Sequence, residues 1–331
     1  MPRRTLQQAP APFQALIDEW ARSLRAENKS ARTIRGYTDA ARFFHIWIAD
    51  PTAPPDTDDP DEWLAGLAAP PSEPSDLDKS HARDWIAYRI ATTSPGNANN
   101  NFRALQQWGN WLLDEGEIEQ HFMAGLKPPH VPEQPVPIVP DAVINAVLDG
   151  CSGRDFLSRR DEAIIRLLWD TGCRLSEIAG LDHNDDLDLV TDSIRVLGKG
   201  GKHRAVPFSP KTGKALGRYL RVRARHPDAE LPALWLGDRR RGPLSANGIK
   251  IMLRRRGRAA GVNDALGRNL HAHLGRHYQS HHFLAAGGSE GDLMRLNGWT
   301  TPQMARRYGQ SAAVERAHET ARRLRVGDRL K

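Results

Sequence analysis

The sequence predicts a mainly α-helical protein with two domains, a helical bundle followed by a mostly helical domain that contains one small antiparallel sheet. Three observations predict this fold class. Apolar residues recur at three- and four-residue steps through most of the chain. One stretch, residues 193–208, alternates instead like a β-hairpin with its turn at Gly198–Gly201. A proline-rich segment divides the chain, whose 331 residues exceed one ordinary core.

Helices account for the amino-terminal domain, and we expect no strand there. Residues 12–49 form two helices, with Ser30 as the N-cap of the second, and further helices span 81–91 and 97–115. The last of these carries large apolar side chains on one face, which we interpret as core rather than as a platform for stacked bases. These side chains are Phe102, Leu105, Trp108, Trp111 and Leu112.

An acidic segment interrupts the amino-terminal domain. Residues 50–78 are rich in proline and contain nine Asp and Glu residues but no Lys or Arg. This composition is typical of a loop or an irregular insertion. Because its charge repels anions, we expect the segment to face away from an anionic partner.

Six prolines between residues 127 and 140 mark the predicted domain boundary. Since proline fixes φ and has no N–H, this segment favours an extended, semi-rigid connector. The predicted organisation is therefore a helical domain over 1–126, a linker over 127–140 and a second domain over 141–331. Helices of the second domain are expected at 141–148, 159–171, 211–225, 246–260, 276–286, 291–297, 302–308 and 312–325.

Composition and charge narrow the class of protein. Hydrophobic residues make up 39% of the chain, which excludes wholesale disorder, and no apolar run approaches the roughly 20 residues that cross a bilayer. The amino terminus shows no secretory signal. Cys151 and Cys173 indicate neither a disulfide framework nor a metal site, so we expect a cytoplasmic protein.

The distribution of charge favours an anionic partner. The net charge is +7 and the pI about 9.6. Residues 1–130 carry 13 basic against 18 acidic groups, whereas the rest of the chain carries 34 against 22. Residues 1–49 add a local excess of 8 basic over 4 acidic groups. Both domains therefore offer basic surface to a polyanion such as DNA.

Four stretches of the second domain carry side chains suited to phosphate chemistry. They read TGCRLSEIAGL, GKGGKHRAVPF, HLGRHYQSHHF and NGWTTPQMARRYG. In this order and spacing they resemble the tyrosine recombinase, or phage integrase, family, of the arm-free or Xer-like type. The likeness covers nearly the whole chain, because the first half resembles that family's SAM-like core-binding domain. The residues concerned are Arg174, Glu177, Lys199, His273, Arg276, His277, Trp299 and Tyr308.

The residue types agree with cleavage of a phosphodiester. The transition state gathers negative charge on the non-bridging oxygens, and two guanidiniums can grip those oxygens with bidentate donors that are always charged. We expect Arg174 and Arg276 to form that clamp. Glu177 falls one turn after Arg174 on the same predicted helix, so it can orient this arginine.

The family resemblance implies roles for the remaining residues. Tyr308 is the nucleophile, and His273 is its general base or helps to hold the phosphate. Lys199 is the general acid that protonates the departing 5′ oxygen. Trp299 stands where many relatives have a second histidine, and it can donate an indole N–H but cannot shuttle protons. The role of His277 is structural.

One position departs from the family pattern. Gly275 replaces the apolar residue, usually leucine, that precedes this arginine. We expect the change to remove a packing group and loosen the local geometry.

Several further cations are expected to meet DNA. Lys202 and Arg204, on the hairpin, are interpreted either as phosphate contacts or as solvated charge. A basic helix near 246–260 and the second helix of the first domain supply more contacts to the phosphate backbone. These contacts are Lys250, Arg254, Arg255, Arg256, Arg32 and Arg35.

The resemblance implies a site-specific DNA recombinase that needs no metal or other cofactor. Cleavage leaves a 3′-phosphotyrosyl link and a free 5′-hydroxyl, and two rounds of strand exchange pass through a Holliday junction. The implied partners are double-stranded DNA recombination sites and a homotetramer in the synapse, with a monomer or dimer off DNA and accessory DNA-bending proteins. No membrane is implied, and the expected location is the cytoplasm, at the nucleoid when DNA is bound. The tail after Tyr308 is expected to dock on a neighbouring protomer through Val314, Ala317, Ala321 and Leu324.

Alternative functions fit the sequence less well. A type IB topoisomerase or telomere resolvase shares the chemistry, but the chain length and the motif spacing argue against both. A non-catalytic DNA-binding relative would have lost a reactive residue, and none is lost here. His273 and His277 are spaced to bind zinc but lack the glutamate of HExxH and a third ligand. The GKGGKH stretch lacks the P-loop pattern, and no acidic cluster indicates a two-metal nuclease.

Overall fold

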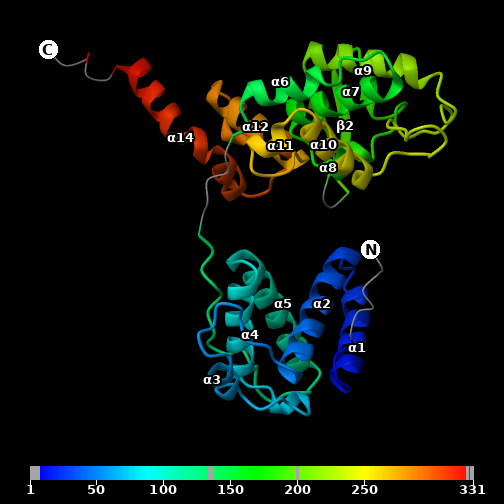
Figure 1. Cartoon of the computed structure of the whole chain (residues 1–331). Coiled ribbons are helices and arrows are strands. Elements are labelled where there is room, and N and C mark those ends of the chain that lie inside the picture. Colours follow the sequence, from blue (N-terminus) through cyan, green and yellow to red (C-terminus); the bar gives the residue numbers. More distant parts are fainter. Residues whose placement is uncertain (1–7, 133–137, 199–200, 326–327, 329–331) are drawn as a thin grey trace. The chain divides into compact units, whose positions relative to one another are not determined.

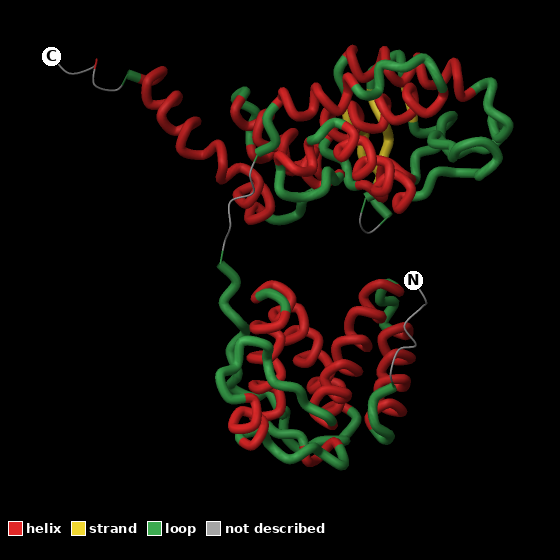
Figure 2. Tube along the Cα trace, viewed as in Figure 1, coloured by secondary structure: helices red, strands yellow, loops and turns green. Residues whose placement is uncertain are grey.

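The protein divides into two compact units, Met1–Gln134 and Pro135–Lys331. The computed structural model describes residues 8–132, 138–198, 201–325 and 328, and within the last helix the side chains of 302–306, 308, 317–318 and 320–325. The division lies inside the proline-rich segment 127–140. Both units are built mainly from helices, and the second holds one small sheet (Figure 2), which confirms the predicted fold class.

Unit 1 is a helical bundle in which α2 packs against α1, α4 and α5 (Figure 1). The Ser30 hydroxyl accepts a hydrogen bond from the Thr33 amide and starts α2, as predicted. The core is unusually aromatic, and the apolar face predicted for α5 is buried in it, from Phe102 to Leu112. The elements are α1 (Phe13–Ala26), α2 (Ala31–Ala49), α3 (Pro60–Ala65), a 3₁₀ turn (Pro74–Asp76), α4 (Lys79–Thr92) and α5 (Pro95–Asp114).

The acidic segment 50–78 is irregular, as expected, but it also forms α3 and the 3₁₀ turn. Two of its carboxylates act as N-caps. Asp59 accepts from the first amides of α3, and Asp78 accepts from the first amides of α4. Part of the acidic charge therefore serves helix initiation, because a carboxylate is favourable at the positive end of a helix.

In the described part of unit 2, eight further helices and one sheet accompany the helix α7. The strands lie in the order β1-β2-β3, and all pairs are antiparallel. The predicted hairpin is confirmed, with Ser193 opposite Pro207 and Leu197 opposite His203. The elements are α6 (Asp141–Asp149), α7 (Phe156–Thr171), α8 (Leu175–Ala179), β1 (Leu187–Asp188), β2 (Ser193–Leu197), β3 (His203–Pro207), α9 (Pro210–Arg223), α10 (Ala246–Ala259), α11 (Val262–Ala265), α12 (Ala272–Ala285), α13 (Glu290–Asn297) and α14 (Pro302–Leu324).

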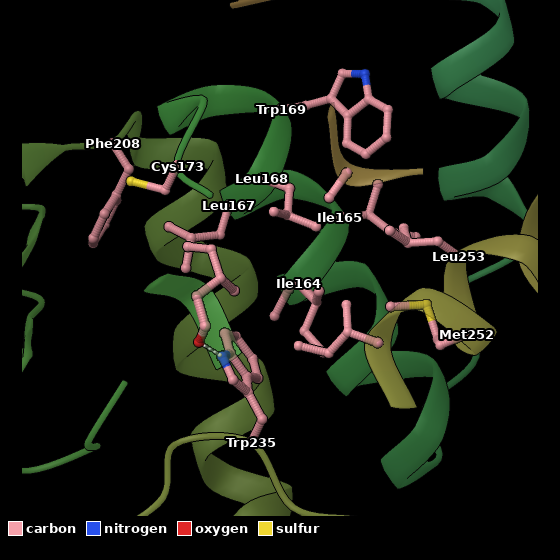
Figure 3. Close-up of a cluster of buried hydrophobic side chains, with 14 of the residues drawn as sticks. Ile164, Ile165, Leu167, Leu168, Trp169, Cys173, Phe208, Trp235, Met252 and Leu253 are labelled. Atoms are coloured by element: carbon pink, nitrogen blue, oxygen red, sulfur yellow. Dashed lines mark hydrogen bonds between the residues drawn. The ribbon is translucent and has the colours of Figure 1, made fainter. Parts of the chain in front are cut away.

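The helix α7 lies at the centre of the unit 2 core. Its side chains Ile164, Ile165, Leu167 and Leu168 are fully buried. Figure 3 shows them among Phe208, which directly follows β3, Trp235, and the α10 residues Met252 and Leu253. The helix packs against α9 and α12. It ends, as predicted, at Gly172, whose φ of 62° is a left-handed conformation that glycine adopts without strain.

The carboxy-terminal helices differ from the prediction. We expected two helices over 302–308 and 312–325, whereas α14 runs without a break over Pro302–Leu324. Gly309 and Ser311 resemble a helix end in the sequence, but neither removes a backbone hydrogen bond as proline does, and glycine inside a helix costs only about 1 kcal/mol. The second half of α14 extends away from the rest of unit 2 (Figure 1), and its described side chains are exposed.

None of the helices in the described part of the chain combines the length and the apolar character needed to span a membrane.

A buried histidine in unit 1 makes the stability of that unit depend on pH. His45 stacks on Phe13 and accepts a hydrogen bond from Trp108 Nε1 (3.1 Å). Burial, with a smaller contribution from the charge of His81, lowers the pKa of His45 from 6.5 to about 3. The unfolded chain therefore binds a proton below pH 6.5 that the folded unit does not bind. We expect the free energy of unfolding of unit 1 to fall by about 1 kcal/mol per pH unit from pH 6.5 towards 3.

Hydrogen exchange of the α2 and α5 amides at pH 7 and pH 5 measures this effect. The variant His45→Gln keeps an acceptor for Trp108 and removes the titrating group, so its stability should vary less with pH than that of the parent. Equal pH slopes in the two proteins would contradict the assignment.

Candidate active site

Tyr308 is buried in the second turn of α14, with 4% of its surface exposed. Its hydroxyl lies 2.8 Å from Nε2 of His273, and the tautomer of the histidine decides which atom donates. The phenol ring stacks on His277, with ring centroids 4.3 Å apart, and on Trp299, at 4.7 Å. Stacking on His277 and Trp299 therefore fixes the ring. The hydroxyl is directed to His273, which is itself exposed.

The local chain directions explain this arrangement. His273 and His277 are one turn apart on α12, so their rings lie on the same face. Gly298, with a φ of 62°, ends α13 and turns the chain so that Trp299 follows directly. The helix α14 then begins at Pro302 and packs against α12, which brings Tyr308 onto the two histidines.

Arg276 lies on the same helix and is almost fully buried, with 3% of its surface exposed. It donates to the carbonyl oxygens of Gly172 (3.0 Å) and Asn297 (2.6 Å), and its Cζ lies 4.9 Å from the centroid of the Trp299 ring. Burial lowers the pKa of Arg276 to about 10, and the nearby positive charge of Arg174 acts in the same direction. The guanidinium remains charged at neutral pH, in a site of low polarity where charge interactions are strong.

Arg174 and Glu177 form the pair that the sequence predicts. Arg174 is the N-cap of the short helix α8, and its backbone amide donates to Oε2 of Glu177 (2.8 Å). Its side-chain Nη1 donates to Oε1 (2.9 Å). The Arg174 side chain is 38% exposed, whereas that of Glu177 is 3% exposed. A partly exposed guanidinium is thus anchored on a buried carboxylate.

Glu177 stays ionised in spite of its burial. Desolvation raises the pKa of this carboxyl group, but hydrogen bonds from Arg204 and from the Arg174 amide outweigh it, so the pKa lies below its ordinary value. The carboxylate therefore remains an acceptor for its arginine donors at neutral pH.

The structure pairs two of the predicted DNA contacts with carboxylates of unit 2. Arg204 donates to both oxygens of Glu177 (3.0 and 2.9 Å) instead of lying in solvent. Arg256 donates to Asp161 Oδ2 (2.9 Å) and to the Gly150 carbonyl (2.8 Å). Both carboxylates are buried and need a counter-charge. The sequence hides these pairs, because the partners are 27 and 95 residues away.

Other predicted DNA contacts are accessible. Lys250, Arg254 and Arg255 on α10 are exposed, and so are Lys202 on the hairpin and Arg32 and Arg35 on α2 of unit 1. Lys199 lies outside the described residues, between the two described ends of the hairpin turn. Among the described residues, no group of three or more His, Cys, Asp or Glu side chains is arranged to hold a metal ion.

Two residues near the α12 start were not singled out from the sequence. His271 is the N-cap position of α12, and its pKa is lowered first by burial and then by the charges of Arg268 and Lys250. The two smaller contributions show that the positive charges of Arg268 and Lys250 lie near His271. Arg268 follows the basic helix α10 by only a few residues, and this closeness in sequence is the signal that could have indicated it as a further cation of the same cluster.

Gly275 has a role that the sequence comparison with relatives did not predict. A Cβ atom at this position would lie 3.0 Å from the Leu168 carbonyl oxygen and 3.1 Å from the Trp169 ring. The glycine therefore lets α12 approach α7 closely, rather than loosening the local geometry. This close packing fixes the helix that carries His273, Arg276 and His277.

The chain is similar in sequence to known proteins of one family. The sequence model of the phage integrase family matches residues 139–315. Tyrosine recombinase XerC of Azotobacter vinelandii is 35% identical over 227 residues, which cover 66% of this chain and 73% of the relative. Tyrosine recombinase XerC of Neisseria meningitidis serogroup C is 30% identical over 287 residues, which cover 83% of each chain.

Solved structures share the fold at low sequence identity. XerH site-specific recombinase bound to a palindromic difH substrate, in a post-cleavage complex, has a TM-score of 0.67 and 14% identity, and covers 93% of this chain and 84% of its own. A lambda integrase tetramer bound to a Holliday junction has a TM-score of 0.63 and 14% identity, with coverage of 90% and 76%.

The close approach at Gly275 predicts that the leucine usual in relatives will not be tolerated here. We expect Gly275→Leu to destabilise unit 2 by about 1–3 kcal/mol, because the added side chain has no room between α12 and α7. Thermal or urea unfolding measures the change. Gly217→Leu is the matched control, since a Cβ there would approach only Arg221 Nη1, at 4.0 Å. Similar stability of the two variants would refute the packing argument.

Proposed function

The chain belongs to the phage integrase family and is a tyrosine-type site-specific DNA recombinase, and we propose that Tyr308 is its nucleophile. The observation that carries the assignment is the 2.8 Å contact between the Tyr308 hydroxyl and His273 Nε2. Trp299 stacks on the same phenol, and Arg276 lies against the Trp299 ring. The proposed substrate is the phosphodiester backbone of double-stranded DNA at a recombination site.

In the proposed cleavage step, His273 Nε2 accepts the phenolic proton as the Tyr308 oxygen attacks phosphorus. A phenol ordinarily has a pKa near 10, so it needs this base to react at neutral pH. The bond from phosphorus to the 5′ oxygen breaks, and that oxygen takes a proton and leaves as a 5′-hydroxyl. Family resemblance assigns the proton donor to Lys199. The products are a 3′-phosphotyrosyl link and a free 5′-hydroxyl.

Strand exchange reverses the same step. A 5′-hydroxyl from another duplex attacks the phosphotyrosine, the new phosphodiester forms, and Tyr308 recovers its proton. The covalent link conserves the energy of the broken bond, so the balance requires no nucleotide hydrolysis. Two rounds of exchange pass through a Holliday junction.

Arg174 and Arg276 are proposed to hold the non-bridging oxygens of the phosphate. Burial of Arg276 supports this role, because pre-positioned charge in a site of low polarity stabilises a transition state by several kcal/mol. Arg174 is the more exposed of the two and is anchored on Glu177. The contacts of Trp299 support a role in packing Tyr308 and Arg276, since its indole N–H cannot take up or release protons at neutral pH.

Binding of the DNA backbone is proposed for the exposed cations of both units. In unit 2 these include Lys250 and Arg254 of α10, and in unit 1 they include Arg32 and Arg35 of α2. Arg268 adds a further positive charge near Lys250 and His271. Counter-ion release on phosphate binding would make the affinity strongly dependent on salt. The proposed location of this DNA binding is the cytoplasm.

A homotetramer on two DNA sites is the proposed active assembly, with monomers or dimers off DNA and accessory DNA-bending proteins as further partners. The lambda integrase tetramer on a Holliday junction supports the tetramer by its shared fold. The tail of α14 is proposed to dock on a neighbouring protomer. One unbroken helix carries both Tyr308 and the exposed residues Ala317, Ala321 and Leu324, so docking of the tail would act directly on the position of the nucleophile.

The assignment of the nucleophile is tested in two steps. The protein first selects its binding site from a pool of random DNA sequences, and a nicked duplex that carries this selected site then serves as the substrate. The wild-type protein should form a covalent protein–DNA complex, visible on a denaturing gel, and Tyr308→Phe should form none because it lacks the attacking oxygen. Tyr278→Phe is the matched control, since Tyr278 lies on α12 and donates to Asp141. A covalent complex with Tyr308→Phe would disprove the assignment.

The tail is tested by two truncations. Removal of residues 310–331 should abolish tetramer formation on DNA and strand exchange, as measured by sedimentation and by a recombination assay, because the docking segment is lost. Removal of residues 326–331 leaves α14 in place and should preserve both. If the longer truncation assembled and exchanged strands normally, the docking proposal would fail.

A further inference from the structure

We propose that Arg204 is a positioning residue for DNA cleavage, which holds Glu177 in place for Arg174 and fixes the end of α13 that precedes Trp299. The inference rests on the proposed function of this site. It assigns to the hairpin a role beyond carrying Lys199, and it differs from the interpretation of Arg204 as a phosphate contact or a solvated charge.

The contacts of Arg204 join three elements of unit 2. The residue lies on β3, opposite Val196 of β2. Its Nη1 and Nη2 donate to the two oxygens of Glu177 on α8, and its Nε donates to the Leu296 carbonyl at the end of α13 (2.8 Å). The side chain is 14% exposed. One guanidinium therefore ties the hairpin to the helix of Arg174 and to the turn before Trp299.

The Glu177 carboxylate is shared between two arginines. Oε1 accepts from Nη1 of Arg174 and Nη1 of Arg204, and Oε2 accepts from the Arg174 amide and Nη2 of Arg204. Because Arg204 neutralises this carboxylate, Arg174 is not its only counter-charge and can direct its other N–H groups to a phosphate. Without Arg204, the carboxylate would compete with the phosphate for Arg174.

The end of α13 is held by two guanidiniums. Arg204 binds the carbonyl of Leu296, and Arg276 binds the carbonyl of Asn297. Carbonyls at a helix end lack partners within the helix and carry partial negative charge, so cations are favourable there. The chain then turns at Gly298 into Trp299. These two contacts therefore set the place where Trp299 meets Tyr308 and Arg276.

Two glycines allow the guanidinium of Arg204 to sit this close to the backbone. A Cβ atom at Gly298 would lie 3.1 Å from Arg204 Nη1, and one at Gly198 would lie 3.2 Å from it. The arrangement also requires arginine. A planar fork reaches two carboxylate oxygens and a carbonyl at once, whereas the ammonium of lysine acts as a single point charge.

The test separates chemistry from DNA binding. Cleavage of the nicked selected duplex is measured at saturating DNA, and DNA affinity is measured over a range of salt concentrations. We expect Arg204→Gln to slow covalent complex formation by about 10- to 100-fold, the range typical of residues that orient a reactive group. Its DNA affinity and salt dependence should stay unchanged. Arg204→Lys, which keeps the charge and guards against a folding defect, should also cleave slowly.

Two comparisons sharpen the result. Arg195→Gln is the matched control, because Arg195 lies on the neighbouring strand β2, is 53% exposed and pairs with Asp186, so it should behave like the wild type. The double variant of Arg204→Gln and Glu177→Gln tests whether Arg204 acts through Glu177. In that case the two losses in cleavage rate should not add, because both remove the same interaction.

Three results would overturn the inference. Weaker DNA binding with a reduced salt dependence and an unchanged saturated rate would make Arg204 a direct phosphate contact. Arg204 would be a purely structural residue if the cleavage rates of Arg204→Gln and Arg204→Lys fell only in proportion to the loss of folded protein and recovered on cooling. Additive losses with Glu177→Gln would show that it does not act through the carboxylate. Failure of the wild-type protein itself to form the covalent complex would instead refute the proposed function.

Discussion

The buried carboxylate of Glu177 is the point on which the arrangement of the candidate site depends. A charge removed from water must be compensated, and four N–H donors from Arg174 and Arg204 compensate this one. Because the donors belong to α8 and β3, satisfying the carboxylate also fixes these elements relative to each other. Arg204 extends the connection to the end of α13. Electrostatic necessity at one residue thus orders three segments that are distant in sequence.

Tyr308, the proposed nucleophile, is held by a different kind of interaction. The ring of Tyr308 is fixed by stacking on His277 and Trp299, and its hydroxyl lies within hydrogen-bond distance of His273 Nε2. Aromatic packing restricts the ring without using the oxygen, so the reacting atom stays available to His273. The close approach of α12 to α7 at Gly275 fixes the helix that carries both histidines. Tyr308 and the tail lie on one continuous helix, so the proposed docking of the tail would act on the position of Tyr308.

The elements that could be predicted from the sequence are those whose signal is local. Helix periodicity, the Ser30 cap, the stop of α7 at Gly172 and the alternation of the hairpin each lie within a few residues, and the structure contains all of them. The two-residue strand β1 was too short to show alternation, and the continuity of α14 was missed because glycine only weakens a helix. The types and spacing of the site residues likewise stood in the sequence, as did the family resemblance that gave them meaning.

The sequence by itself determined the class of fold, the family and the candidate site residues, since each depends on residue type and short spacing. Only the tertiary structure decided which arginines pair with buried carboxylates and which are exposed. Arg204 and Arg254 are both basic residues in basic stretches, yet one is paired with Glu177 and the other is exposed. The difference lies in carboxylates brought close by folding from positions far along the chain, and the burial that makes such pairs obligatory exists only after the core has formed.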